Sequence, residues 1–331
     1  MSLYHSVTIG SLTLEGNIFL APVAGYSDRA FRSICVEQGA DFTYTELISS
    51  EALVRHGVKA GTLLRRADNE DRYSIQLFGA DPEVMYKAAA LLSPYRPAVV
   101  DINAGCPVPK VVKTGAGSAL MRNPLLLGRI VAAAVRSSQD HLEGAAVTVK
   151  LRSGWDGTSV NYYECARIAA DSGAALVSIH ARTREQGYGG KSDWSHIGDL
   201  VSRVKVPVAG SGDLFSPEDA ERMLRETGCA AVMFARGAMG NPFIFSGTRS
   251  LLLTGSYTVP ETAERLKTGF RQLLLLSQDL GERIACREMR KQFCAYTRGI
   301  PGGAPLRNRL VHAETLEAYR ELLAQYGGLT I

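Results

Sequence analysis

Short apolar segments of four to six residues alternate with longer amphipathic segments between residues 17 and 245. The short segments are bounded by Gly, Pro, Asn or Asp, as buried β-strands commonly are. The longer segments between them have the length and pattern of surface helices. We therefore expect eight strands, over Ile18–Pro22, Phe42–Thr45, Tyr73–Leu77, Ala98–Ile102, Ala146–Leu151, Leu176–Ile179, Val206–Ala209 and Ala231–Phe234.

Capping signals support the helices between these strands. A capping residue followed by Pro at the first helical position opens several of them, at Asp81, Asn123, Ser216 and Asn241. Ser27 is expected to cap the helix that ends at Gly39, whereas Gly173 and Gly228 are expected to end two others.

Eight consecutive strand–helix units predict an α/β protein of the (β/α)₈ TIM-barrel class over residues 1–245. A hairpin over residues 7–16 is expected to plug the amino end of the barrel, because alternating residues there surround a Gly-Ser turn. Strand signals are missing after residue 245, so residues 246–331 are expected to form a small helical domain. Its predicted helices cover Thr262–Leu280 and Glu282–Thr297.

Composition indicates a cytoplasmic protein of enzyme size. The chain has 331 residues, of which 46% are hydrophobic and 21% charged, and no apolar run approaches the ~20 residues of a membrane span. No secretory signal is visible at the start of the sequence. The six cysteines form no C-x-x-C pair, which argues against a zinc site and suits a reducing compartment. We expect no bound metal, no membrane contact and a monomer.

The formal net charge of +4 is concentrated in the last quarter of the chain. Residues 246–331 contain 12 Lys and Arg against 8 Asp and Glu, so the preceding 245 residues are neutral. Between Arg283 and Arg309, seven cations accompany a single acidic residue, Glu288. Such a cluster predicts a surface that binds a polyanion, although a solvated helix face would have the same composition.

Candidate chemistry lies at the carboxyl ends of the expected strands, where barrel enzymes place their active sites. Asn103 and Cys106 follow the fourth strand, with Cys106 on a Gly-Cys-Pro turn. Gln76 ends the third strand. Two further strand ends carry titratable pairs, Lys150 with Arg152 and His180 with Arg182. A buried lysine is costly without an anionic partner. One such strand end could be a satisfied core residue, but several together indicate a functional site.

Glycine-rich turns after the seventh and eighth strands predict a phosphate site. The turns contain Ser211-Gly212-Asp213 and Ala235-Arg236, and barrels frequently bind phosphate at this place. Arg236 can add a bidentate contact. After the first strand, the small residues of Pro22-Val23-Ala24 let backbone approach a flat ring closely.

In this order along about 300 residues, these motifs closely resemble those of the tRNA-dihydrouridine synthases. They are Ala-Pro-Val-Ala-Gly, Gln-Leu-Phe-Gly, Asn-x-Gly-Cys-Pro, Lys-x-Arg, His-x-Arg-Thr-Arg, Gly-Asp and Arg-Gly-Ala. The Cys-Pro-x-x-Lys-Val run is most similar to the bacterial B-type enzymes. Val23, Ser211 and Ala235 depart from the family pattern, which usually has Met, Asn and Gly at these positions.

The resemblance implies an enzyme that reduces specific uridines of tRNA to 5,6-dihydrouridine, with FMN as cofactor and NADPH as reductant. Cys106 would be the proton donor, and Lys150 would stabilise negative charge on the reduced flavin. FMN would be held by Pro22, Val23, Ala24, Gln76, Lys150, His180, Ser211, Gly212, Asp213, Ala235 and Arg236. The residues expected to bind tRNA are Asn103, Arg152, Arg182, Arg287, Arg290 and Lys291.

Two other functions fit part of the pattern. An FMN barrel that reduces a free pyrimidine, similar to a dihydroorotate dehydrogenase, would share the cofactor site but would have no use for a basic helical domain. A tRNA-binding protein without catalysis would use that domain but would not need Cys106, Lys150 and His180 together.

Overall fold

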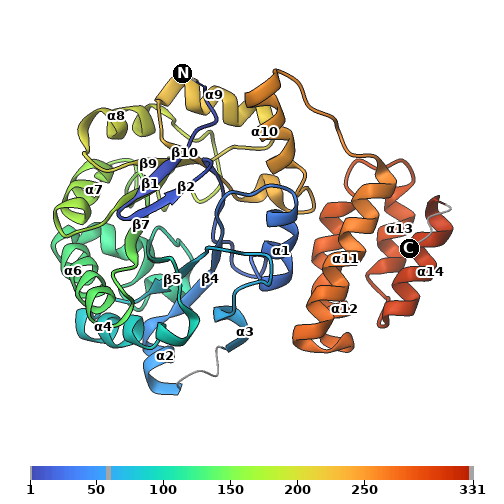
Figure 1. The fold of residues 1–331 in the computed structure, drawn as a ribbon, viewed down its shortest axis with the longest axis horizontal. Helices are drawn as coiled ribbons and strands as arrows, with labels where there is room; N and C mark the ends of the chain where they lie inside the picture. Colours follow the sequence, from blue (N-terminus) through green and yellow to red (C-terminus); the bar gives the residue numbers. More distant parts are fainter. Residues whose placement is uncertain (1, 57–60, 328–331) are drawn as a thin grey trace.

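Eight parallel strands form the central sheet of this protein (Figure 1). The computed structural model describes residues 2–56 and 61–327. Along the sheet the strand order is β3-β10-β9-β8-β7-β6-β5-β4. The strands are β3 (Ile18–Leu20), β4 (Tyr44–Ser49), β5 (Ser74–Phe78), β6 (Val99–Ala104), β7 (Ala146–Arg152), β8 (Leu176–His180), β9 (Val208–Ser211) and β10 (Ala231–Phe234).

The sheet closes into a barrel between its first and last strands. The amide of Leu20 donates to the carbonyl of Phe42 at 2.9 Å, and the amide of Asp41 donates to the carbonyl of Ile18 at 2.9 Å. A parallel bridge pairs Phe19 with Phe42 just before β4 begins. These contacts confirm the predicted (β/α)₈ barrel, and all eight strands lie where the sequence places them to within a few residues.

Helices surround the barrel, and Figure 1 shows them as an outer ring. They are α1 (Arg29–Glu37), α2 (Ser50–His56), α3 (Gly61–Leu64), α4 (Pro82–Ala90), α5 (Pro109–Val112), α6 (Pro124–His141), α7 (Tyr162–Asp171), α8 (Ser195–Arg203), α9 (Pro217–Thr227) and α10 (Ile244–Thr254). Within the described residues, short 3₁₀ turns lie between them at Ser93–Tyr95, Gly117–Arg122 and Arg236–Ala238.

Most of the predicted helix caps are present. Asp81, Asn123 and Ser216 each accept a hydrogen bond from the first turn of their helix. The prediction for Ser27 is wrong, because Asp28 accepts the bond from the amide of Phe31. Asn241 is not a cap either, since α10 begins three residues later.

Strands β5 to β7 place polar residues inside the barrel. Gln76, Asp101 and Thr148 are neighbours in register on β5, β6 and β7, and all three are fully buried. At the amino end of the barrel, the hairpin of β1 (Val7–Ile9) and β2 (Leu12–Leu14) packs against the apolar first residues of the strands. The hairpin therefore closes one end of the barrel, and the site must lie at the other.

The carboxyl-terminal part forms a separate helical domain beside α1, coloured orange to red in Figure 1. It consists of α11 (Thr262–Leu280), α12 (Glu282–Tyr296), α13 (Gly303–Leu310) and α14 (Leu316–Gly327), which share their own apolar core. Ion pairs attach it to the barrel, with Arg29 Nε 2.9 Å from the Asp279 carboxylate and Arg271 Nη2 2.6 Å from that of Glu37.

The predicted boundary at residue 245 falls inside α10, whose buried residues belong to the core of the barrel. The physical reason is that Ile244 and Phe245 are apolar and pack inward, so the chain leaves the barrel only after Gly255. The helices α13 and α14 were not predicted, because Gly and Pro surround the first.

Candidate active site

A cavity of about 330 Å³ opens at the carboxyl end of the barrel. Side chains from strands β6 to β9 meet there with loops that follow β3, β8 and β10. The structure thus brings together most of the residues that the sequence singled out. Those lining the cavity are Pro22, Val23, Ala24, Asn103, Cys106, Lys150, Arg152, His180, Ser211, Gly212, Asp213, Ala235 and Arg236.

The backbone of Cys106 is held on both sides. Its amide donates to Asn103 Oδ1 at 2.9 Å, and its carbonyl accepts from the amide of Ser118 at 3.0 Å. Gly117 must be glycine, because its φ is +61° and an added Cβ would lie 2.8 Å from the Cys106 carbonyl oxygen. Burial raises the pKa of the Cys106 thiol, although nearby cations oppose the shift. Cys106 is therefore a protonated thiol at neutral pH, on a fixed loop.

Lys150 supplies a positive charge inside the barrel. Burial and, to a smaller extent, the charge of Arg152 lower its pKa to about 8, while the charge of Asp101 acts in the opposite direction. The protonation state of such a lysine depends on what binds beside it, because an anion in the cavity stabilises the protonated form.

His180 is neutral at physiological pH. Burial, followed by the charges of Lys150 and the surrounding arginines, lowers its pKa far below the ordinary value. Arg182 Nη1 lies 3.2 Å from His180 Nε2. Since a guanidinium can only donate, Nε2 accepts and the ring proton is on Nδ1. His180 therefore offers one N–H donor and no charge.

Arg182 itself does not line the cavity. Its guanidinium donates to the carbonyls of Gly189 and Gly190 and to the carboxylate of Asp213 at 2.7 Å. The Asp213 carboxylate also accepts from the amide of Ser192. Burial opposes ionisation of Asp213, but these donors outweigh it and lower the pKa. Arg182 thus fixes the loop after β8 without lining the cavity, whereas Asp213 lines the cavity and also accepts from Arg182.

Arg152 connects two loops across the rim of the cavity. Its Nε donates to the carbonyl of Gly105 at 2.9 Å, and Nη1 donates to the carbonyls of Thr183 and Gly187, both at 2.9 Å. The first loop carries Cys106 and the second carries Tyr188. Arg152 therefore sets the distance between the thiol and the opposite wall.

The far end of the cavity is suited to an anion. The Arg236 guanidinium lies over the ring of Tyr188 at 4.4 Å and near that of Phe215 at 5.2 Å, and its Nη2 lies 3.3 Å from Asp213 Oδ1. Gly212 has a φ of +113°, and an added Cβ would collide with Ser192 Oγ. Tyr188 and Phe215 were missed by sequence analysis, since an exposed aromatic in a loop carries no local signal.

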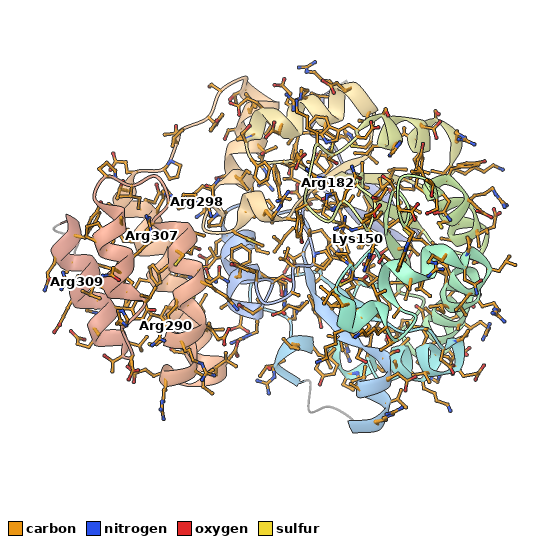
Figure 2. The ribbon with its side chains drawn as sticks, turned by 180° about the vertical axis from the view of Figure 1, so that it is seen from behind. Lys150, Arg182, Arg290, Arg298, Arg307 and Arg309 are labelled. Carbon is orange, nitrogen blue, oxygen red and sulfur yellow. The ribbon has the colours of Figure 1, made fainter. Side chains whose placement is uncertain are left out.

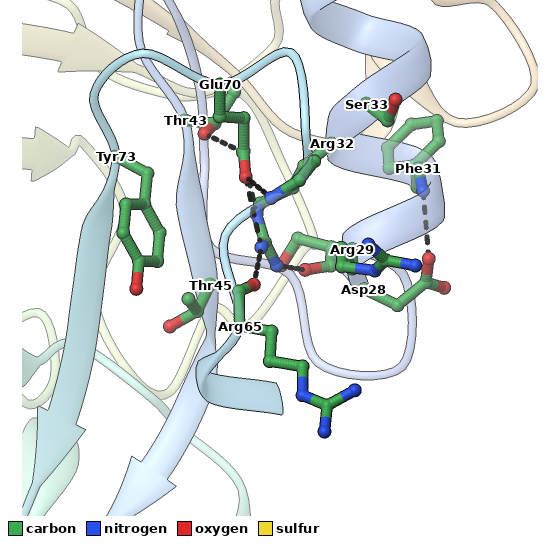
Figure 3. Close-up of polar contacts among 12 residues, drawn as sticks. Asp28, Arg29, Phe31, Arg32, Ser33, Thr43, Thr45, Arg65, Glu70 and Tyr73 are labelled. Carbon is green, nitrogen blue, oxygen red and sulfur yellow. Dashed lines mark hydrogen bonds and ion pairs between the residues drawn. The ribbon is translucent and has the colours of Figure 1, made fainter. Parts of the chain in front are cut away.

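A buried ion pair between Arg32 and Glu70 (Figure 3) supports the loop that carries Pro22–Ala24, which line the cavity. Arg32 Nε lies 2.9 Å from Glu70 Oε1, and neither side chain is exposed. Arg32 also donates to the carbonyl of Ser27 at 3.0 Å. The hydroxyl of Ser27 in turn accepts from the amide of Val23 at 2.9 Å. This chain of contacts holds the small residues against the cavity.

The basic residues of α12, in the helical domain, point in different directions. Arg287 and Arg290 line an open groove together with Arg283. Lys291 faces the barrel instead, 2.9 Å from the Glu288 carboxylate and above the ring of Tyr26. Figure 2 shows Arg290, Arg298, Arg307 and Arg309 on this domain, apart from Lys150 and Arg182 in the barrel.

Gln76 does not line the cavity. Its side chain is fully buried below the cavity, where it contacts Asp101 and Asn103. Within the described residues, no group of three or more His, Cys, Asp and Glu side chains is arranged to hold a metal ion. None of the helices in the described ranges is long and apolar enough to cross a membrane.

The barrel is closed, and its carboxyl end brings together the Cys106 thiol, the buried Lys150 and Arg236. Such an arrangement is typical of a barrel enzyme. A sequence profile described as "Dihydrouridine synthase (Dus)" matches residues 19–326. The chain belongs to this family.

Relatives of known sequence agree with this assignment, and a solved structure agrees with the fold. A "Probable tRNA-dihydrouridine synthase" of Treponema pallidum is 49% identical, over 97% of this chain and 96% of its own length. A "tRNA-dihydrouridine synthase B" of Pasteurella multocida is 35% identical, over 88% and 87%. The fold is similar to that of histamine dehydrogenase from a Rhizobium species, with a TM-score of 0.60 and 13% identity over 82% of this chain and 51% of the other.

Proposed function

We propose that this enzyme reduces uridines of tRNA to 5,6-dihydrouridine, with FMN as its cofactor and NADPH as its reductant. The observation that carries the proposal is the Cys106 thiol, which is fixed at the mouth of a cation-lined barrel cavity. Family membership supplies the reaction class. Cys106 would donate the proton to carbon 5 of uracil.

The residues present fit FMN. Small side chains at Ala21, Pro22 and Ala24 leave room for a flat ring, and Arg236 with the Gly212 turn suits a phosphate. Lys150 lies where it would bind the pyrimidine edge of the ring and stabilise negative charge there. Bound and reduced, FMN would supply the hydride for carbon 6 of uracil.

The protein's own groups would act on the base. The neutral His180 would donate a hydrogen bond from Nδ1. Arg152 would hold the loop that carries Tyr188, so that this side chain keeps solvent out of the cavity. Cys106 would hold its proton until the base is bound, because burial raises the pKa of the thiol. We further propose that the enzyme acts as a monomer in the cytoplasm, where tRNA is modified.

The direct test compares substrates. Purified protein with its flavin is mixed with NADPH and either unmodified tRNA or free uracil derivatives, and dihydrouridine and NADPH consumption are measured. We expect turnover with tRNA and little with the free pyrimidine. Equal turnover with both would favour the alternative of a free-pyrimidine reductase, and a protein without flavin or turnover would be a tRNA-binding protein.

We predict that the α12 groove binds tRNA phosphates. The double variant Arg287→Gln and Arg290→Gln should flatten the slope of log affinity against log salt by about 1 to 2 units, at ~0.7–0.9 per lost phosphate contact. FMN content should not change, because the groove is apart from the cavity. The measurement is tRNA binding at several salt concentrations.

The matched control is Lys267→Gln with Arg320→Gln, which removes the same charge from other helices of that domain. Arg320 is already paired with Glu317 at 2.8 Å. If the control changes the salt slope as much as the groove variant does, the groove makes no specific phosphate contact.

The proton-donating step should have a characteristic pH dependence. A general acid works only below its pKa, and burial raises that of Cys106. The rate of tRNA-dependent flavin reoxidation should therefore stay constant through neutral pH and fall only above the free-thiol pKa of about 8.5. A midpoint below that of a free thiol would contradict this assignment.

A further inference from the structure

Two arginines share one tryptophan ring just outside the cavity. The guanidinium carbon of Arg122 lies 4.9 Å from the centroid of the Trp155 ring, and that of Arg184 lies 4.7 Å from the same centroid. Arg122 ends the 3₁₀ turn between β6 and α6, Trp155 follows β7, and Arg184 follows β8. None of the three lines the cavity. We refer to Arg122, Trp155 and Arg184 as the rim cluster.

Hydrogen bonds between neighbouring loops hold the rim cluster in place. The amide of Arg184 donates to the carbonyl of Gly154, beside Trp155, at 2.9 Å. On the other side, Asn161 Nδ2 donates to the carbonyl of Met121, which precedes the first arginine, at 2.7 Å. The three loops are therefore tied together where the cluster forms. A cluster that is already ordered loses less conformational freedom when it binds a ligand.

The two guanidinium groups of the rim cluster have no counter-charge in the part of the chain that the structure describes. Arg203 and Arg222 also stack on aromatic rings, but each pairs with a carboxylate, at 3.0 and 3.2 Å. Arg122 and Arg184 form no such pair with a described residue. Because their like charges repel each other, an anion bound by both would stabilise them. Guanidinium groups match the geometry of phosphate especially well.

The loop that carries Cys106 is itself basic. Residues 105–123 contain Lys110, Lys113 and Arg122 but no acidic residue, and all three side chains are exposed. Residues 1–245 are formally neutral as a whole, so this positive charge is local to one side of the cavity mouth. A local excess of positive charge attracts a polyanion.

The rim cluster lies across the barrel from the helical domain. That domain packs against α1, which follows β3. Around the closed barrel, β7 is four strands from β3 in either direction. Figure 1 accordingly shows α6 and α7 on the side of the ring away from α11 and α12. A polyanion held by the helical domain alone would be anchored on only one side of the cavity.

We propose that the rim cluster binds a backbone phosphate of the tRNA strand whose uridine enters the cavity. This inference rests on the proposed function, because it takes tRNA as the substrate. A base that is flipped into a pocket leaves its sugar–phosphate backbone outside, so the adjacent phosphates lie at the cavity mouth. With the helical domain on one side and the rim cluster on the other, the strand is held on both sides of Cys106.

The test removes both charges of the cluster, in the double variant Arg122→Gln and Arg184→Gln. We expect tRNA affinity to fall by about 10-fold or more. The slope of log affinity against log salt should flatten by about 1 to 2 units, at ~0.7–0.9 per lost phosphate contact. FMN content should be normal, because the cluster lies outside the cavity. The measurement is binding of unmodified tRNA at several salt concentrations, with flavin absorbance as the check of folding.

Arg203→Gln with Arg222→Gln is the matched control. It removes the same charge from two arginines that also stack on aromatic rings, but on the outer helices α8 and α9. We expect this control to bind tRNA with normal affinity and a normal salt slope.

Three results would overturn the inference. They are normal affinity and salt slope in the rim-cluster variant, an equal loss in the control, and a higher KM for NADPH without a change in tRNA affinity. The last result would assign the rim cluster to the phosphates of the dinucleotide. Failure of the proposed function is distinguishable, since the unsubstituted protein would then form no dihydrouridine in tRNA.

Discussion

Replacing Cys106 with alanine should slow the reduction of tRNA by about 10²–10⁴, the range for loss of a general acid. FMN binding and the rate of its reduction by NADPH should not change, because the thiol is needed only when carbon 5 of uracil is protonated. The measurement is single-turnover reoxidation of the reduced flavin by unmodified tRNA. The loss should appear in that step alone.

Cys294→Ala provides the control for this experiment. Cys294 is the exposed cysteine of α12 and lies outside the cavity, so its removal tests for non-specific effects of losing a thiol. Near-normal turnover of Cys106→Ala would exclude Cys106 as the proton donor, and equal losses in both variants would show that the effect is not specific to the active site.

Replacing Arg236 with alanine should weaken FMN binding by about 10- to 150-fold. This range corresponds to the ~1.5–3 kcal/mol of a hydrogen bond to a charged group. The guanidinium lines the cavity at the turn after β10, where the phosphate would bind. The measurement is FMN affinity by titration of the apoprotein, and Arg236→Lys should give an intermediate value because it keeps the charge but not the bidentate geometry.

Arg222→Ala is the matched control for Arg236. Arg222 is also stacked on an aromatic ring, that of Trp194 at 4.7 Å, but it lies on α9 outside the cavity and pairs with Asp219. We expect the Arg222→Ala variant to bind FMN with normal affinity. An Arg236→Ala protein that holds FMN as tightly as the Arg222 variant would show that the phosphate binds elsewhere.

The fold could be read from the sequence because its signals are local. The strands around Ile18, Val99 and Ala231 are apolar segments between turn residues, and their length alone distinguishes them from helices. Asp81, Asn123 and Ser216 begin their helices because a cap and a following Pro act within one turn. Ser27 was mistaken for a cap because Asp28, one residue later, offers the same kind of acceptor.

Which residues line the cavity was also largely predictable from the sequence. Parallel strands in a barrel bring their carboxyl ends to one rim, so Cys106, Lys150 and His180 must meet there although they are far apart in the chain. The position along each strand, together with a residue type that is costly to bury, was sufficient to identify them.

Individual roles were decided by the tertiary structure. Arg182 has the residue type of a ligand contact, but its guanidinium is directed to protein groups and does not line the cavity. Lys291 belongs to a basic cluster in sequence, yet it faces the barrel because of its place on α12. A sequence determines which groups reach a given rim, whereas hydrogen-bond partners depend on distances of a few tenths of an ångström between segments far apart in the chain, and only the folded structure sets those.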